Sequence, residues 1–205
     1  MNKRFIWNFE INEGKPLQIP SAINFVQTPN KWEARFFWPS DQIITLNGLD
    51  DNFLKLSNYQ LKHRADTYYL LPNADYNLKI RHNQLFYKPL LMKKPLAVAY
   101  GKKIKLEENA SDLELPGIDT HDITALLSHI KMNSTKISVE KEALIFQFET
   151  TPTTKIELAW LTVAKKSYFT ACIESRAFSI VESIAQQLLG DKPSSDYVTF
   201  LKGIT

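Results

Sequence analysis

Three segments of this chain alternate between apolar and other residues, and each carries charge on the side opposite its apolar face. These charges are Glu157 in IELAWLTVA, Glu174 in YFTACIES, and Lys79 with Arg81 in NLKIRH. A period of two residues indicates β-strands. An open sheet would turn the charged faces to water, whereas a closed barrel would turn them into its lumen, where the charges need partners.

The other periodic segments extend this pattern. Further strands are expected at 32–38, 67–71, 84–91, 97–106 and 136–148. A hairpin turn at His82-Asn83 is expected to join the NLKIRH strand, at 77–82, to the strand at 84–91. Helical spacing follows at 123–130, with Asp119 or Thr120 as the expected N-cap, and at 178–189, which Gly190 would end. A short helix is expected from Ser195. Many strands with few, late helices predict an α+β protein made mainly of antiparallel sheet, with helix 178–189 outside it.

Composition excludes several classes of protein. The chain of 205 residues is 44% hydrophobic and 23% charged, which argues against a disordered or low-complexity protein. Its single cysteine, Cys172, excludes an intramolecular disulfide framework and a cysteine-rich zinc site. Asn8 and Glu10 interrupt the start of the chain and no apolar run approaches about 20 residues, so we expect a cytoplasmic protein. Residues 1–30 are expected to be an N-terminal extension to one domain at 31–205.

Charge is unevenly distributed along the chain. Ten basic residues lie between Lys62 and Lys105, where only Asp66 and Asp75 oppose them, and the local net charge is +8. The following stretch, 107–122, contains acidic residues and no Lys or Arg. A basic segment of this density favours a polyanionic partner, and a solvated face balanced elsewhere in the fold is the alternative.

The order of these elements resembles that of a known family. The run DTYYLLPNADYNLKIRHNQLFYKPLL, then KIELAWL, FTACIES, a helix and SDYVTFL, is similar to the CYTH superfamily, or triphosphate tunnel metalloenzymes, over residues 31–201. The resemblance implies an eight-stranded antiparallel β tunnel, in which basic residues hold a triphosphate and acidic residues hold a divalent metal. Members of the family hydrolyse tripolyphosphate or thiamine triphosphate, some cyclise ATP, and RNA triphosphatases are relatives.

The resemblance also assigns residues. The family's opening Glu-x-Glu-x-Lys corresponds to Lys31-Trp32-Glu33-Ala34-Arg35, so a lysine replaces the first acid. In the final acidic pair, Cys172 replaces the first glutamate and Glu174 is kept. The implied phosphate-binding residues are Arg35, Lys79, Arg81, Lys88 and Lys141, and the implied metal ligands are Glu33, Glu157 and Glu174.

These residue types suit polyphosphate chemistry. Arginine and lysine form charge-assisted hydrogen bonds with phosphate oxygens, and carboxylates with waters and phosphate oxygens are usual ligands of Mg²⁺. The leading hypothesis is therefore a phosphohydrolase, dependent on Mg²⁺ or Mn²⁺, that acts on tripolyphosphate, thiamine triphosphate or a nucleoside triphosphate. The alternative is a non-catalytic polyphosphate- or nucleotide-binding protein with a degenerate metal site. Neither a membrane nor a nucleic acid is expected as partner.

Overall fold

The computed structural model describes residues 2–12, 14–19, 28–107, 115–118 and 123–205. This part of the chain forms a β-rich α+β fold, which confirms the predicted class. Its helices are α1 (Ile123–Asn133), α2 (Phe178–Leu189) and α3 (Tyr197–Gly203), with a short 3-10 turn at Leu56–Asn58. Its strands are β1 (Asn2–Ile6), β2 (Phe9–Asn12), β3 (Lys31–Pro39), β4 (Ile44–Asn47), β5 (Gln60–Leu70), β6 (Asn77–Arg81), β7 (Gln84–Lys88), β8 (Leu90–Lys93), β9 (Val98–Tyr100), β10 (Ile104–Leu106), β11 (Thr135–Phe148), β12 (Thr154–Val163) and β13 (Lys166–Ser175).

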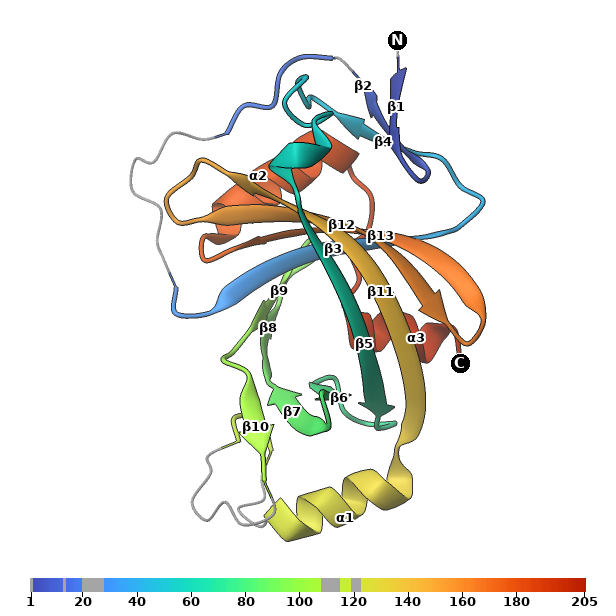
Figure 1. Cartoon of the computed structure of the whole chain (residues 1–205). Coiled ribbons are helices and arrows are strands. Elements are labelled where there is room, and N and C mark those ends of the chain that lie inside the picture. Colours follow the sequence, from blue (N-terminus) through green and yellow to red (C-terminus); the bar gives the residue numbers. More distant parts are fainter. Residues whose placement is uncertain (1, 13, 20–27, 108–114, 119–122) are drawn as a thin grey trace.

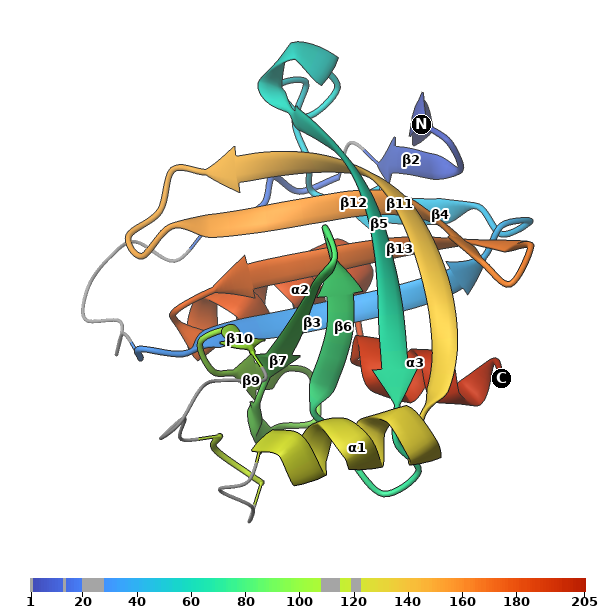
Figure 2. The same ribbon diagram turned by 60° about the horizontal axis from the view of Figure 1, so that its bottom comes forward.

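Ten of these strands form one antiparallel sheet in the order β10-β7-β6-β5-β11-β12-β13-β3-β9-β8. The sheet is strongly curved, so β3, β12 and β13 lie across a concave space from β6 and β7 (Figures 1 and 2). Within the described residues no pairing joins β10 to β8, so the closure of an eight-stranded barrel remains a prediction. The other three strands form a small sheet in which β2 lies between β1 and β4.

The convex face of the large sheet carries the main hydrophobic core. The apolar side of β3 (Trp32, Ala34, Phe36 and Trp38) packs there with α2 and the small sheet. Helix α2 spans the predicted range and ends at Gly190, whose positive φ of 67° is strain-free only for glycine. Strands β1 and β2 contribute to the same core, so residues within the predicted 1–30 extension pack against the main body.

A second core fills one end of the concave face. Helix α3 packs there, with Leu201 fully buried and Phe200 stacked on Phe37 at a centroid distance of 3.8 Å. Apolar side chains therefore fill this end of the concave face, and only the rest of that face is left for a cavity. Helix α1 packs against β6 and β7 in a third core that includes Leu126 and Ile130 (Figure 2).

Several element boundaries differ from the sequence-based expectation. The segment expected at 84–91 is divided at Pro89, which has no backbone N–H to donate to a ladder. The segment expected at 97–106 forms two strands, and the one expected at 67–71 begins at Gln60. The turn at His82-Asn83 is confirmed, with positive φ at both residues, as a type I′ hairpin requires. Asp119 and Thr120 lie outside the described residues.

Candidate functional site

The concave face of the large sheet holds a cavity of about 650 Å³. Eight of the ten strands contribute residues to its lining, and α3 contributes Tyr197. All the residues that the resemblance assigns to phosphate or metal line this one cavity, namely Glu33, Arg35, Lys79, Arg81, Lys88, Lys141, Glu157 and Glu174. The structure therefore brings together side chains separated by up to about 140 positions in the sequence.

Strand register explains this convergence. In the antiparallel ladder, Glu174 lies opposite Glu33, and Cys172 lies opposite both Arg35 and Glu157. Paired residues of neighbouring strands point to the same face of a sheet, as do residues two positions apart along a strand. The polar side of each alternating strand consequently faces the cavity, while the apolar side faces the main core.

Each predicted metal-binding carboxylate is paired with a cation. The Lys88 ammonium lies 2.5 Å from Glu33, and the Lys31 ammonium lies 2.6 Å from Glu174. Glu157 accepts hydrogen bonds from Lys141 at 2.8 Å and from Arg35 at 3.0 Å. Lys31, where the resemblance implies an acid, is thus the partner of Glu174.

A fourth carboxylate, Asp66, supports the basic pair on β6. It accepts hydrogen bonds from Lys79 at 3.0 Å and from Arg81 at 2.6 Å and 2.5 Å. The resemblance did not assign Asp66. The sequence nevertheless contains a feature that could have indicated Asp66 as a cavity residue. Asp66 is one of two acids within the basic segment, and it shares a strand face with Arg64 and Tyr68.

These contacts shift the protonation equilibria of the cavity groups. Burial raises the pKa of Glu33 and of Glu157, but the neighbouring lysines and Arg35 lower it by more, so both carboxyl groups have a pKa below the usual value. Burial lowers the pKa of Lys79 to about 8, against the opposing effect of Asp66. Glu33 and Glu157 are therefore ionised at neutral pH, and Lys79 is closer to losing its charge near that pH than an ordinary lysine is.

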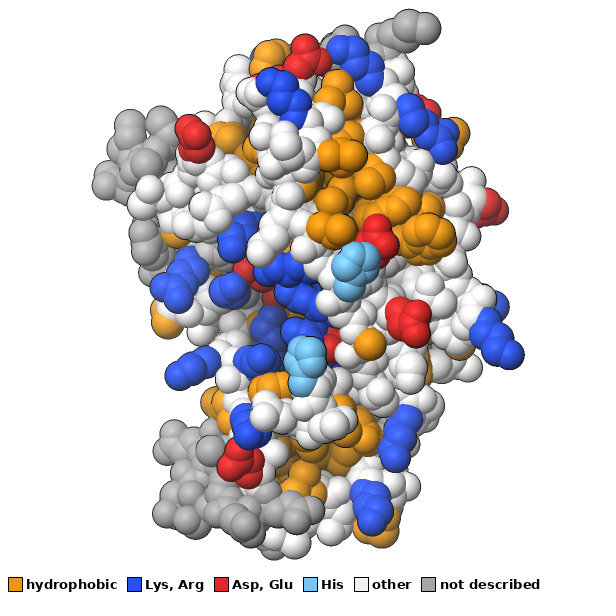
Figure 3. Space-filling view, viewed as in Figure 1, with side chains coloured by type: hydrophobic (Ala, Val, Ile, Leu, Met, Phe, Trp, Pro, Cys, Tyr) orange, Lys and Arg blue, Asp and Glu red, His pale blue; other side chains and the backbone are white. Residues whose placement is uncertain are grey.

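Sequence reasoning missed several lining residues. Arg64, Lys102 and Lys103 belong to the basic segment without an assigned role, and Arg176 lies outside it. In all, the lining contains ten Lys and Arg side chains and three glutamates, and Asp66 behind them brings the net formal charge to +6. Figure 3 shows Lys and Arg side chains gathered around a hollow in the left half of the view.

Aromatic rings lie beside these cations. Lys88 lies 4.3 Å from the ring centroid of Tyr100, and the guanidinium of Arg35 lies 4.7 Å from that of Tyr197. Three buried polar atoms of the lining have no hydrogen-bond partner in the described part of the chain: Arg35 Nε, Asn77 Oδ1 and the Tyr100 hydroxyl. Buried polar groups are usually satisfied, so these atoms indicate hydrogen-bonding capacity that a bound molecule would use.

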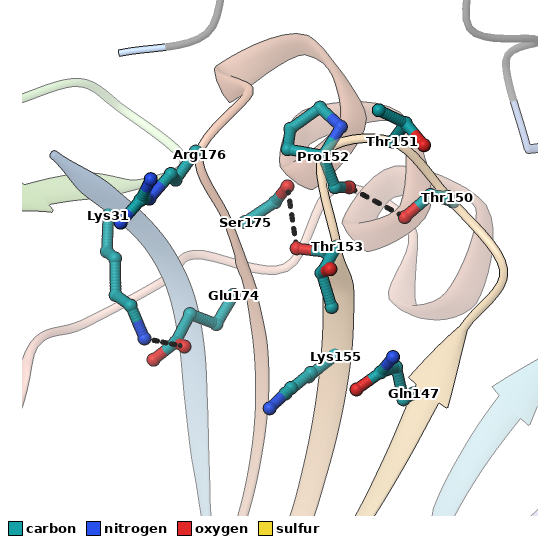
Figure 4. A pocket seen from close by; sticks show the side chains of 10 residues that line it. All are labelled: Lys31, Gln147, Thr150, Thr151, Pro152, Thr153, Lys155, Glu174, Ser175 and Arg176. Carbon is teal, nitrogen blue, oxygen red and sulfur yellow. Dashed lines mark hydrogen bonds and ion pairs between the residues drawn. The ribbon is translucent and has the colours of Figure 1, made fainter. Parts of the chain in front are cut away.

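A second cavity, of about 530 Å³ and drawn in Figure 4, shares lining residues with the first. Both are lined by Lys31, Glu174 and Arg176, and the ion pair between Lys31 and Glu174 lies where they meet. Lys155 and three threonines of the β11–β12 loop are also among the residues that line the second cavity. The cationic surface therefore continues beyond the first cavity.

The carboxylates do not form a metal-binding set in their present arrangement. Among the described residues, no three His, Cys, Asp or Glu side chains are close enough together to hold a metal ion. Cys172 is 2% exposed, and burial raises the pKa of its thiol. The predicted ligands Glu33, Glu157 and Glu174 line one cavity, but lysine and arginine already neutralise them, so the site does not fit a resident Mg²⁺ or Mn²⁺.

Comparison with known proteins gives no further identification. No family model matches this chain, and no curated protein matches it either. None of the helices described here is long and apolar enough to cross a membrane.

Proposed function

We propose that this protein binds the polyphosphate group of a small molecule in the cavity on the concave face. The observation that carries the proposal is the convergence of ten Lys and Arg side chains on one cavity with only four nearby carboxylates. Like charges in a partly desolvated space repel one another, and a bound polyanion relieves that repulsion.

The arrangement of the cations favours several linked phosphates over a single anion. Lys79 and Arg81 extend from β6, Lys88 from β7, and Arg35 from β3, so positive charge surrounds the space on opposing walls. A linear polyphosphate carries its charges along its length and would contact all these walls. Arginine can donate to two phosphate oxygens at once, which adds geometric selectivity.

The same geometry supports the proposal that the chain is a divergent CYTH-like protein. Eight strands line the cavity, as an eight-stranded tunnel would require, and the cations and acids named from the resemblance are among the lining residues. In this proposal α3 fills one end of the tunnel, with Tyr197 at the boundary between the apolar core and the cavity.

A phosphohydrolase acting on the same ligand is the second candidate. The observation that favours it is the direct register pairing of Glu33 with Glu174 inside the cavity, which places two carboxylates side by side. Binding without turnover agrees better with the ion pairs, because both of these carboxylates are engaged by lysines. We therefore place binding first and hydrolysis second.

Calorimetric titration and thermal unfolding with tripolyphosphate test the proposal. At about 100 times its dissociation constant, the ligand should stabilise the folded protein by about 2.7 kcal/mol, which corresponds to a rise in Tm of about 5–11 °C. Sulfate at equal ionic strength should protect much less. Arg81→Ala should weaken the effect of tripolyphosphate, because it removes one of the cations that line the cavity. The variant should still fold, because Asp66 keeps Lys79 as a partner.

The matched control is Lys166→Ala. Lys166 is exposed at the start of β13, beside the β12–β13 turn, and does not line the cavity. Equal protection by sulfate and tripolyphosphate, or equal loss in both variants, would refute the proposed site. Phosphate release from tripolyphosphate, thiamine triphosphate or nucleoside triphosphates, with and without Mg²⁺ or Mn²⁺, separates the hydrolase from the binding protein.

A further inference from the structure

We infer that the cavity takes its polyphosphate as the metal-free anion, because lysines of the protein supply the positive charge that a divalent metal would otherwise bring. This inference rests on the proposed function and deepens it by naming the form of the ligand. It concerns three pairs, Lys31 with Glu174, Lys88 with Glu33, and Lys141 with Glu157.

The distances show how closely the lysines occupy the carboxylates. Each ammonium lies between 2.5 and 2.8 Å from an oxygen of its glutamate. Mg²⁺ binds oxygen at 2.0–2.1 Å and demands near-octahedral geometry. A magnesium ion bound to one of these oxygens would be within a few ångströms of the ammonium, so the lysine would have to move away.

Moving Lys88 or Lys141 would be costly. The side chain of Lys141 is 9% exposed and that of Lys88 is 23% exposed, so both lie largely within the protein. The surroundings already carry a net charge of +6, and a divalent cation would raise it further. A metal-free polyanion instead compensates the excess charge and leaves the existing pairs intact.

The carboxylates have a different role in this reading, which is to position the cations. Glu157 bridges Arg35 and Lys141, and Asp66 bridges Lys79 and Arg81. Long cationic side chains lose considerable rotamer freedom when a ligand orders them. Because the ion pairs hold these cations in place before the ligand arrives, less of that entropy remains to be lost on binding.

Lys31 is the position at which the preference can be tested. Its side chain is the most exposed of the three lysines, at 51%, so substitution there should be compatible with folding. Lys31→Glu removes the ammonium and adds a third carboxylate next to the register pair of Glu33 and Glu174. Three adjacent carboxylates are the kind of oxygen cluster that binds Mg²⁺.

The experiment is calorimetric titration of tripolyphosphate into the full-length protein, once in EDTA and once in excess Mg²⁺. For the unmodified protein, the apparent affinity should fall at least about tenfold in Mg²⁺, because complexation removes the free anion. For Lys31→Glu, the affinity in EDTA should fall and Mg²⁺ should restore part of it. Binding of tripolyphosphate by Lys31→Gln should still be weakened by Mg²⁺, since this variant adds no carboxylate. Lys166→Glu makes the same charge change as Lys31→Glu but outside the cavity, and it should behave as the unmodified protein.

The outcomes separate this inference from the proposed function. Tighter binding of tripolyphosphate in Mg²⁺ than in EDTA by the unmodified protein overturns the inference and leaves the proposed function standing. Absence of binding under both conditions defeats the proposed function itself. If circular dichroism shows that Lys31→Glu does not fold, the affinities of the unmodified protein and of Lys31→Gln in EDTA and in Mg²⁺ still test whether the cavity binds the metal-free anion.

Discussion

Replacing Glu157 by Gln should destabilise the free protein and should make its stability depend more strongly on a bound polyanion. Glu157 is 14% exposed, and it accepts hydrogen bonds from Arg35 and Lys141, which are 10% and 9% exposed. Removal of one partner from a buried ion pair typically costs about 3–5 kcal/mol, because the remaining charges are left uncompensated. Glutamine keeps one oxygen acceptor, so we expect the lower end, about 3 kcal/mol.

A loss of that size corresponds to a fall in Tm of about 6–12 °C for a chain of this length. Urea unfolding followed by circular dichroism measures the free-energy difference directly. Tripolyphosphate would supply the negative charge that the variant lacks, so the rise in Tm that it causes should be larger for Glu157→Gln than for the unmodified protein. Unchanged stability, or equal protection of both proteins by the ligand, would show that the Glu157 pairs do not organise the cavity.

The effect should also depend on pH. Folding lowers the pKa of Glu157, so its contribution to stability is fully present above the pKa in the unfolded chain, about 4.3, and is lost as pH falls towards the folded value. The difference between the two proteins should therefore narrow below about pH 4. A difference that stays constant down to acid pH would indicate a packing defect in place of a lost charge.

Two further predictions concern the cavity and the core beside it. Because the pKa of Lys79 is about 8 and a bound polyanion raises it, tripolyphosphate binding near pH 8.5 should take up protons, seen as a dependence of the calorimetric heat on buffer ionisation enthalpy. Lys79→Met should reduce this uptake, and equal uptake by both proteins would contradict the assignment. Leu201→Ala, at a fully buried position of α3, should cost about 3 kcal/mol in urea unfolding. Met132→Ala, where the side chain is 76% exposed, should change stability by less than about 0.5 kcal/mol, and equal losses would mean that α3 does not close a packed core.

The amino-acid sequence by itself determined which side chains share a face. Period-two alternation placed Glu33 with Arg35 and Lys79 with Arg81 on the polar sides of their strands, and helical spacing located α2. This information is local, because the direction of a side chain along a strand follows from its position in the pleat. It therefore predicted the polar side of each strand, but it left open whether that side faces water or a lumen.

Tertiary structure alone decided which of these side chains meet. The curvature of the sheet brings Lys88 of β7 to Glu33 of β3. The pairing of β3 with β13 places Lys31 beside Glu174, 143 positions away. In IELAWLTVA, alternation puts Trp160 on the apolar face with Ile156 and Leu158, opposite Glu157. Trp160 is nevertheless 41% exposed, and among the described rings it contacts only Trp7 and Phe169. Periodicity specifies the face of a strand, but the order of strands, the curvature of the sheet and the extent of the layers that cover it depend on contacts between distant parts of the chain.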